Sequence, residues 1–396
     1  MKIVQINSTC GAGSTGKICV SVSDLLSREG IENYVLYTLE NSSHPKAIKY
    51  STDLYAKSQA LRSRILGNNG FNSKRATAKL IKLLEDIEPD GVHIHNIHSH
   101  DCDLRVLFEY LRKKKIKIWW TFHDCWSFTA YCHYFTLSGC DKWQSGCREC
   151  PRRKEYSWFA DRSERIYSLK KELSEGLDLT IVTPSQWLCD LVKKSFFADY
   201  PVKVINNGID LSVFKPTESD IGNVLGVGDK KLLLGVAFGW DRRKGIDVFV
   251  ELARRLDDSY AIVLVGTDEK VEKLLPKNII AIRRTKNQEE LAKLYTAADL
   301  FVNPTREENY PTVNMEAIAC GTPVLTFRTG GSTEIIGELT GASVPADDLD
   351  ALEREIIRIC ETKPYSKENC VKQAEGFDMA LRFREYVEMY KESLEK

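Results

Sequence analysis

The sequence predicts an α/β protein that contains two doubly wound parallel sheets. At 396 residues, the chain is long enough for two α/β domains that each have their own core. Short apolar runs typical of buried strands alternate with helical patterns, most regularly in the second half. A polar stretch that follows one of these runs, residues 305–312, leads into a good helix former, as in the ligand-binding loops of open α/β sheets.

In the first half, a glycine-rich loop at residues 11–17 separates the first strand from a helix that is expected over residues 18–28. Strands are predicted at residues 2–7, 34–39, 91–96, 115–122, 179–185 and 202–205.

In the second half, strands and helical patterns alternate without interruption, which indicates a second doubly wound sheet. A final helix is expected over residues 377–394. Strands are predicted at residues 231–237, 261–266, 278–283, 299–303 and 323–326.

The charge balance and the cysteine content narrow the classes of protein. Lysine and arginine together number 56, as do aspartate and glutamate, so the balance indicates no nucleic-acid partner. No run approaches the roughly 20 apolar residues that a membrane-spanning helix needs. Twelve cysteines without a secretory signal favour a reducing, cytoplasmic compartment.

Residues 305–317 form the stretch with the clearest chemical content. Glu308 lies in the loop between a predicted strand and a predicted helix, and Glu316 lies about two turns inside that helix. The amides of Thr312 and Val313 at the helix N-terminus suit a diphosphate, and two carboxylates suit the hydroxyl groups of a sugar and a ribose. The alternative interpretation is a solvated helix face.

The loop at residues 11–17 fits more than one pattern. Gly11, Gly13 and Gly16 form G-x-G-x-x-G, and Glu40 stands near the end of the next strand, as an NAD-dependent oxidoreductase requires. The phosphate-loop pattern fails at Ile18, where a hydroxyl residue is needed. A glycine-rich turn that only allows tight packing is the simplest interpretation.

Histidines and cysteines mark two further candidate regions. His95, His98 and His123 lie in or just after the ends of neighbouring predicted strands, which suggests a metal site, but no flanking carboxylate set is obvious in the sequence. A turn-rich loop contains four cysteines whose spacing fits one tetrahedral, structural zinc ion, with four unligated thiols as the alternative. These are Cys132, Cys140, Cys147 and Cys150.

Residues 57–82 contain seven basic residues and no acidic ones, beside an apolar set that includes Leu61 and Ile65. A basic amphipathic surface suits the anionic face of a membrane. An ordinary solvated helix face is the competing interpretation.

The pair Glu308-x7-Glu316, the H-D-x-W stretch that starts at His123, and the N-G-I-D stretch at residues 207–210 together resemble one family. This family is the retaining, family-4-type glycosyltransferases with the GT-B fold. The cysteine-rich loop is similar to that of members from bacterial capsule, exopolysaccharide and colanic-acid assembly.

The resemblance implies two Rossmann-like domains that face a cleft. The acceptor-side domain would span residues 1–208, with a cysteine-rich insertion near 125–152, and the donor-binding domain would span 209–376. Residues 377–396 would form a helix that crosses back to the first domain.

The resemblance also implies roles for individual residues. Glu308 would accept hydrogen bonds from the donor sugar, and Glu316 from the ribose. Lys244, with Arg243 or Arg242, would neutralise the leaving diphosphate without a catalytic metal. His123 would contact the primary hydroxyl of the sugar, and Gly13 and Gly16 would lie near the diphosphate. No protein nucleophile is assigned.

The expected function is therefore transfer of a hexose-type sugar from a UDP- or GDP-sugar to a glycan or lipid-linked acceptor. The expected location is cytoplasmic, peripheral on the inner face of the membrane. Two alternatives stay open, namely the NAD-dependent oxidoreductase and a catalytically silent scaffold with the same fold.

Overall fold

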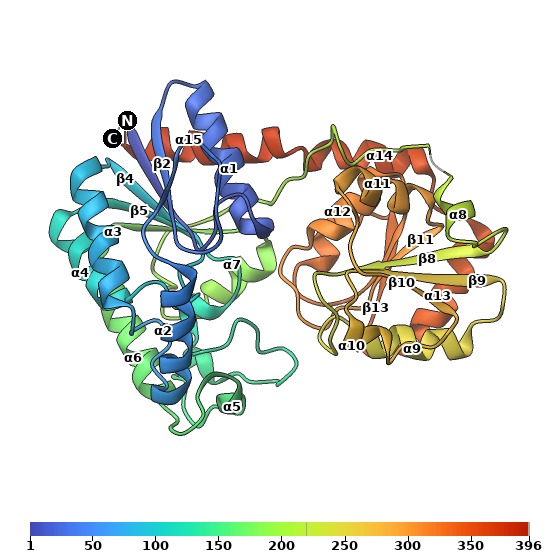
Figure 1. The fold of residues 1–396 in the computed structure, drawn as a ribbon, viewed down its shortest axis with the longest axis horizontal. Helices are drawn as coiled ribbons and strands as arrows, with labels where there is room; N and C mark the ends of the chain where they lie inside the picture. Colours follow the sequence, from blue (N-terminus) through green and yellow to red (C-terminus); the bar gives the residue numbers. More distant parts are fainter. Residues whose placement is uncertain (219, 395–396) are drawn as a thin grey trace. The chain divides into compact units, whose positions relative to one another are not determined.

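The structure is a computed structural model that describes residues 1–218 and 220–394. It divides into two compact units, each with its own parallel sheet (Figure 1). Unit 1 comprises Met1–Asn206 and the segment from Arg382 onward, and unit 2 comprises Asn207–Leu381. The predicted segment 377–396 ends in two residues, 395 and 396, that lie outside the described part of the chain.

Unit 1 contains a seven-stranded sheet in the order β3-β2-β1-β4-β5-β6-β7, with all neighbouring strands parallel. Its strands are β1 (Lys2–Ile6), β2 (Glu32–Tyr37), β3 (Ala47–Lys49), β4 (Gly91–Ile94), β5 (Lys117–Thr121), β6 (Leu179–Thr183) and β7 (Val202–Val204). Its α-helices are α1 (Gly13–Arg28), α2 (Asp53–Leu66), α3 (Lys74–Ile87), α4 (Leu104–Lys114), α5 (Arg153–Tyr156), α6 (Ser163–Ser174) and α7 (Gln186–Val192). Short 3-10 turns are η1 (Trp126–Phe128) and η2 (Lys142–Gln144).

Apolar strands form the centre of unit 1 because helices cover both faces of the sheet (Figure 1). In the central register, Ile6 pairs with Ile94, and Ile94 pairs with Trp120. All three side chains are buried. The prediction of a doubly wound parallel sheet is confirmed for this half of the chain.

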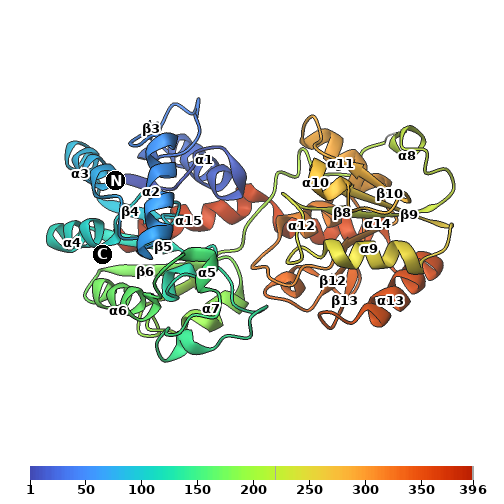
Figure 2. The same cartoon turned by 60° about the horizontal axis from the view of Figure 1, so that its bottom comes forward.

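Unit 2 contains a six-stranded parallel sheet in the order β10-β9-β8-β11-β12-β13, which Figure 2 shows with helices on its two faces. Its strands are β8 (Lys231–Val236), β9 (Tyr260–Val265), β10 (Ile279–Ile282), β11 (Leu300–Asn303), β12 (Val324–Phe327) and β13 (Gly341–Val344). Its helices are α8 (Ile221–Val224), α9 (Ile246–Arg255), α10 (Glu269–Glu272), α11 (Gln288–Ala297), α12 (Thr312–Ala319), α13 (Leu349–Thr362) and α14 (Lys367–Ala374), with 3-10 turns η3 (Ser332–Ile335) and η4 (Glu375–Phe377).

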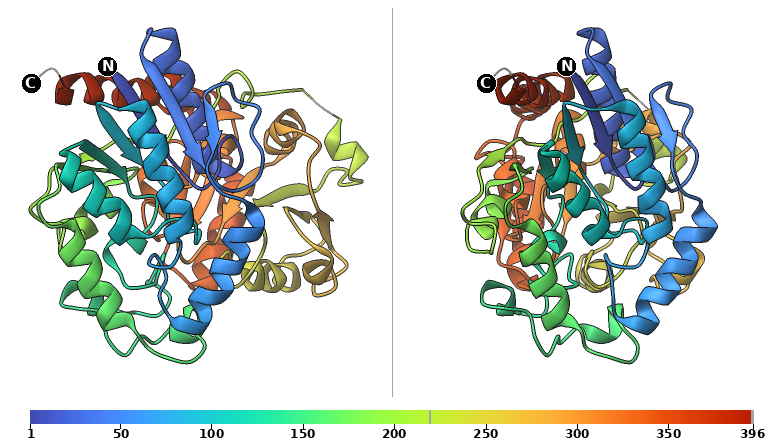
Figure 3. Two further views of the ribbon diagram at one scale, coloured as in Figure 1. Left: turned by 60° about the vertical axis from the view of Figure 1, so that its left-hand side comes forward. Right: turned by 90° about the vertical axis from the view of Figure 1, so that its left-hand side faces the viewer.

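The last helix, α15 (Met379–Leu394), begins in unit 2, and its later turns pack in unit 1 (Figure 3). Within unit 1, the hydroxyl of Tyr390 lies 2.5 Å from Nδ1 of His93, and its ring contacts Trp119 at a centroid distance of 4.7 Å. Lys391 forms an ion pair with Glu29, which follows α1. This end of α15 is therefore part of the unit 1 core.

One local prediction needs correction, and the structure adds two features that the sequence did not indicate. Helix α1 begins at Gly13 rather than at residue 18, so Gly13 and Gly16 lie in its first turns instead of in the preceding loop. Strands β3 and β13 were not predicted. The basic stretch 57–82 spans parts of two helices, α2 and α3, separated by a left-handed Gly67.

Within residues 1–218 and 220–394, no helix combines the length and the apolar character needed to span a bilayer.

Candidate functional site

In unit 2, the sheet order reverses between β8 and β11, which lie side by side although they are far apart in sequence. In doubly wound sheets, ligands bind at this switch point, outside the carboxyl ends of the strands. The loop after β8 carries Arg242, Arg243 and Lys244, and the loop after β11 carries Glu308. The fold thus places the predicted basic clamp and the predicted sugar-binding glutamate at the same edge.

Lys244 and Glu308 are in direct contact at this edge. The ammonium group of Lys244 donates a hydrogen bond to Oε2 of Glu308 at 2.5 Å, and the amide of Asn309 donates to Oε1 at 3.1 Å. Burial raises the pKa of Glu308, but the charges of Lys244 and Arg243 and these hydrogen bonds outweigh it and lower the pKa below its usual value. Glu308 is therefore a carboxylate at neutral pH.

Arg306 is a residue of this site that the sequence did not single out. Its side chain is only 7% exposed, and it donates to Asp347 at 2.6 Å and to both carboxylate oxygens of Asp247 at 2.8 Å. It also donates to the carbonyl of Arg242, and its backbone amide donates to the carbonyl of Arg243. Arg306 therefore joins the loop after β11 to the loop after β8, and this fixes Lys244 near Glu308.

Helix α12 presents the second predicted glutamate and a free N-terminus. Pro311 is its N-cap residue and no side chain caps the helix, so the amides of the first turn, at Thr312 and Val313, remain directed along the axis. Glu316 accepts a hydrogen bond from the hydroxyl of Tyr295 at 3.0 Å. That contact orients Glu316, which is partly exposed.

The backbone of Glu308 is itself held by a close neighbour. Gly330 has a φ of +54°, and a Cβ atom at this position would lie 1.7 Å from the carbonyl oxygen of Glu308. The adjacent Gly331 donates its amide to the carbonyl of Asn309 at 2.8 Å. Only glycine allows the two loops to approach this closely, and the contact fixes the position of the Glu308 backbone.

In unit 1, the order reverses between β1 and β4. The two loops that follow these strands are joined, because Asn7 Oδ1 accepts from the amide of Asn96 at 3.0 Å and Ser8 Oγ donates to the carbonyl of Asn96 at 2.9 Å. Gly16 lies against this junction, since a Cβ there would be 2.7 Å from Oγ1 of Thr9. Gly13 has a φ of +65° and nothing within 4 Å of the Cβ position.

His123 follows β5 and lies beside His95, which follows β4, with His123 Nε2 3.2 Å from His95 Nδ1. Burial, assisted by the nearby His98, lowers the pKa of His123 to about 4, although Asp124 opposes the shift. His123 is therefore neutral at pH 7 and suited to hydrogen bonding with a hydroxyl group rather than to charge neutralisation.

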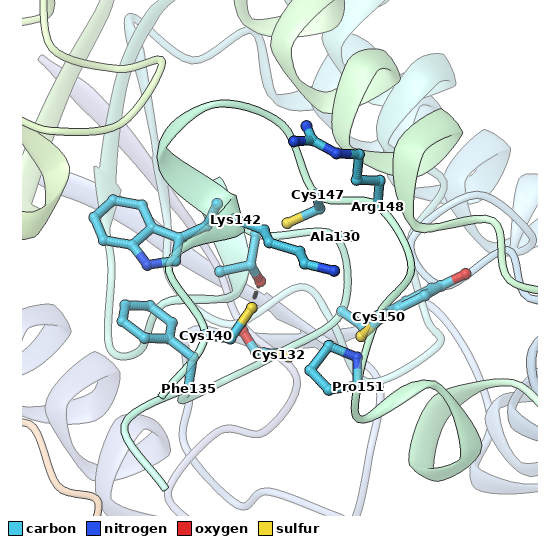
Figure 4. A pocket seen from close by; sticks show the side chains of 12 residues that line it. Ala130, Cys132, Phe135, Cys140, Lys142, Cys147, Arg148, Cys150 and Pro151 are labelled. Atoms are coloured by element: carbon cyan, nitrogen blue, oxygen red, sulfur yellow. Dashed lines mark hydrogen bonds between the residues drawn. The ribbon is translucent and has the colours of Figure 1, made fainter. Parts of the chain in front are cut away.

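The four cysteines of the predicted zinc site line one pocket, together with Phe135, Lys142 and Trp143 (Figure 4). The thiols of Cys132 and Cys150 are hydrogen-bonded to each other. No three of the four sulfur atoms lie within 4.8 Å of one another, whereas sulfurs around one zinc ion are about 3.8 Å apart. All four are free thiols in the structure, and the zinc site stays a prediction.

Lys170 on α6 holds the start of the cysteine loop in place. The ammonium group of Lys170 is buried and donates to the carbonyls of Trp126 at 2.7 Å and Thr129 at 3.0 Å. Burial lowers the pKa of Lys170 well below its usual value.

The carboxylate of Asp124 lies close to two histidines of unit 1, which the sequence did not indicate. Asp124 lies between His98 and His133, and their ligand atoms are all within 4.8 Å of one another. The spacing of these residues in the sequence did not indicate the cluster. His98 follows β4, Asp124 follows β5, and His133 lies in the cysteine loop.

Two Rossmann-like units, each with a doubly wound parallel sheet, are the architecture of the GT-B class of glycosyltransferases. Residues 16–213 match the model of Glycosyltransferase Family 4 and residues 222–377 match that of Glycosyl transferases group 1, so the chain belongs to this family of glycosyltransferases. The family match decides between the transferase and the oxidoreductase in favour of the transferase.

Known proteins support this assignment over the whole chain. The chain is 22% identical over 366 residues to the putative colanic acid biosynthesis glycosyl transferase WcaC of Escherichia coli, covering 88% of each protein. Sucrose-phosphate synthase from Thermosynechococcus elongatus has a similar fold, with a TM-score of 0.74, 19% identity and coverage of 99% of this chain and 98% of the other. HepE from Anabaena, in complex with UDP-glucose, gives a TM-score of 0.71 at 15% identity, covering 99% of this chain and 100% of HepE. The predicted GT-B fold is confirmed.

Proposed function

We propose that this protein is a retaining glycosyltransferase that moves a hexose-type sugar from a UDP- or GDP-sugar to a glycan or lipid-linked acceptor in bacterial surface polysaccharide assembly. The observation that carries the proposal is the 2.5 Å contact between Lys244 and Glu308 at the switch point of unit 2. It joins the two groups that a nucleotide-sugar needs, a cation for the diphosphate and a carboxylate for the sugar hydroxyls.

In this proposal, binding of the donor breaks the contact between Lys244 and Glu308, because one residue binds the diphosphate and the other binds the sugar. The ammonium group of Lys244 would turn to the diphosphate, with Arg243 beside it, while Glu308 would accept hydrogen bonds from ring hydroxyls. The amides of Thr312 and Val313 would add partial positive charge at the phosphates. Because negative charge on the leaving diphosphate grows in the transition state, these groups would stabilise that state more than the ground state.

Glu316 would accept hydrogen bonds from the ribose, in the orientation that Tyr295 imposes. On the acceptor-side domain, His123, Gly13 and Gly16 would take the donor-contacting roles. No carboxylate is assigned as nucleophile, and the departing phosphate would draw off the acceptor proton in a front-face attack. The diphosphate clamp would need no metal ion.

The relatives support the choice of substrates. HepE is described in complex with UDP-glucose, which supports a nucleotide-sugar donor, and the name of WcaC places that protein in colanic acid biosynthesis. A polysaccharide precursor on a lipid carrier would place the enzyme on the cytoplasmic face of the membrane.

Replacing Glu308 with glutamine tests the proposal. The Glu308→Gln variant should lower the turnover of the accepted sugar donor by about ten- to a hundredfold, because one charge-assisted hydrogen bond is worth roughly 1.5–3 kcal/mol. Its affinity for free UDP or GDP should change little. Turnover is measured as nucleoside diphosphate release across a panel of UDP- and GDP-sugars, and affinity by calorimetry, with and without EDTA.

Glu272→Gln is the matched control, because it breaks an ion pair with Arg283 on the same unit, and neither residue is assigned a contact with the donor. Full turnover in Glu308→Gln would remove the central assignment. If the wild-type protein binds UDP or GDP tightly but releases no nucleoside diphosphate from any sugar donor, it is instead a catalytically silent scaffold.

A further inference from the structure

Two imidazoles and one carboxylate converge at the carboxyl edge of the unit 1 sheet. His98 follows β4, Asp124 follows β5, and His133 lies nine residues further along. Oδ2 of Asp124 lies 3.2 Å from Nε2 of His98 and 3.0 Å from Nδ1 of His133. The rings of His98 and His133 are in contact, with a centroid distance of 4.4 Å.

The contact between His98 and Asp124 does not have the geometry of a hydrogen bond. Nε2 of His98 is buried, and it has no hydrogen-bond partner within the described residues although Oδ2 of Asp124 is 3.2 Å away. A buried polar atom of this kind usually has an unseen partner. This nitrogen is therefore available as a ligand atom beside the carboxylate of Asp124.

The separations fit ligands around a single ion. With bonds of about 2.1 Å, neighbouring ligand atoms lie about 3.0 Å apart at right angles and about 3.4 Å apart at the tetrahedral angle. The two separations at Asp124, 3.0 Å and 3.2 Å, lie in this range.

The surrounding contacts hold these side chains in place. Oδ1 of Asp124 accepts from the amide of Trp126 at 2.8 Å, and Oδ2 is hydrogen-bonded to Nδ1 of His133 at 3.0 Å, so both oxygens are held in a defined orientation. The amide of Cys125 donates to the carbonyl of His133 at 2.8 Å, and the ring of His98 packs against that of Trp126. Contacts of this kind orient metal ligands in proteins.

We propose that His98, Asp124 and His133 bind a divalent transition-metal ion, with Zn²⁺ the best match to two imidazoles and one carboxylate. Three protein ligands leave at least one coordination position open to water. The site is distinct from the cysteine pocket and from the Lys244–Glu308 pair, so it does not depend on the proposed transferase chemistry.

Cobalt(II) is a suitable probe because its visible d–d bands report an ordered site of nitrogen and oxygen ligands. The whole chain, stripped with EDTA and dialysed, is titrated with CoCl₂ and then with ZnCl₂. In the Cys147→Ser variant, which removes the predicted cysteine site, one equivalent of Co²⁺ should produce visible bands without the near-ultraviolet charge-transfer band of thiolate ligands, and Zn²⁺ should abolish them. Metal analysis of freshly purified protein should find zinc.

Substitution of single ligands identifies the site. His98→Gln and His133→Gln should each weaken Co²⁺ binding by at least about tenfold, since even the loss of an outer contact has that effect on metal sites. His44→Gln is the matched control, because His44 lies 3.1 Å from Asp24 in a pair that lacks the second histidine.

Three results would overturn the proposal. The first is the absence of saturable Co²⁺ binding by the folded chain. The second is binding that both histidine variants retain in full. The third is a Co²⁺ spectrum that is lost completely in Cys147→Ser, which would assign the ion to the cysteine pocket alone.

Discussion

Arg306 explains how a lysine and a glutamate from distant loops come into contact. Its guanidinium group is buried between Asp247 and Asp347, and its amide and side chain hold the carbonyls of Arg243 and Arg242. A buried arginine with two carboxylate partners has its charge compensated, and its fork geometry fixes direction as well as distance. The position of Lys244 therefore depends on a residue that need not touch substrate.

The structure also distinguishes between Arg242 and Arg243, which the sequence left as alternatives for the contact with the diphosphate. Arg243 is half-buried, and its charge contributes to the lowered pKa of Glu308, whereas Arg242 is exposed. Arg243→Ala should therefore lower kcat/KM by about ten- to a hundredfold through loss of a charged contact to the diphosphate. Arg242→Ala should change kcat/KM less than about threefold.

Nucleoside diphosphate release gives kcat/KM for both variants, and UDP or GDP affinity by calorimetry shows whether the ground state is also affected. The reverse order of effects would exchange the two assignments. Equal, negligible effects would mean that neither arginine contacts the diphosphate.

At the scale of elements, the turn at Gly330 supports the Glu308 loop from the neighbouring strand. A methyl group at Gly330 would collide with the carbonyl of Glu308, so Gly330→Ala must displace one of the two loops. Activity should fall at least about tenfold, because catalytic groups tolerate little displacement. The free energy of unfolding should also fall by more than the roughly 1 kcal/mol that positive φ alone costs.

Gly226→Ala is the control for this experiment, since Gly226 has a φ of +67° but nothing within 4 Å of its Cβ position. Urea unfolding and nucleoside diphosphate release are measured on both variants. Equal losses in the two would show that backbone strain, and not contact with Glu308, explains the effect.

The sequence indicated that Lys244 and Glu308 follow strands of one sheet, because the relevant information is local. Apolar strands and helix starts locate Lys244 and Glu308 at the ends of β8 and β11, and parallel pairing then brings them to one edge. Arg306 and the cluster at Asp124 could not be predicted in this way, because their partners come from other strands and loops. The start of α1 was misplaced because its first turns contain Gly13 and Gly16, which are poor helix formers.

The cysteine loop is a further element whose state can be tested. The four cysteines line one pocket, and a zinc ion that draws their sulfurs together would order a segment with only one short turn, η2, between Cys140 and Cys147. We expect about one cysteine-bound zinc per chain, which Cys147→Ser should lose. Metal analysis combined with titration of accessible thiols measures both.

Acceptor use should fall more than donor binding in Cys147→Ser, because the loop belongs to unit 1. Ser138→Ala, in the same loop, should retain the metal. Four freely reacting thiols in the folded wild-type protein, with no bound zinc beyond that at the Asp124 cluster, would leave the cysteines as unligated residues.

At the scale of the whole molecule, the largest unpartnered apolar side chains of unit 1 gather around α2. Leu54, Leu61 and Ile65 are 79%, 52% and 42% exposed, although the opposite face of α2 buries only Ala56, Gln59 and Ser63. The amide of Trp158 donates to the carbonyl of Arg64, which brings Trp158 and the 72% exposed Phe159 to the end of this helix. We call this set, Leu54, Leu61, Ile65, Trp158 and Phe159, the α2 surface.

Basic residues flank Leu61 and Ile65, and no acidic residue occurs from 57 to 82, although Asp53 begins α2. Lys57, Arg62 and Arg64 are all on α2. Exposed apolar side chains within a basic surround suit an anionic bilayer, where the apolar groups enter the interface and each basic residue near the surface adds about 1 kcal/mol. A lipid-linked acceptor lies in the plane of such a surface, so we propose that unit 1 docks there.

Sedimentation with lipid vesicles tests this docking. The protein should bind vesicles that contain phosphatidylglycerol more strongly than neutral ones, and binding should weaken as salt rises, because exposed charges are screened within about 8 Å at physiological ionic strength. The double variant Leu61→Glu/Phe159→Glu should lose most of the bound fraction while UDP or GDP affinity stays unchanged, since neither residue is assigned a contact with the donor. Leu274→Glu, which places the same charge at a 75% exposed leucine of unit 2, should bind vesicles like the wild type. Equal binding to neutral and anionic vesicles, or a double variant that sediments like the wild type, would remove the α2 surface as the docking site.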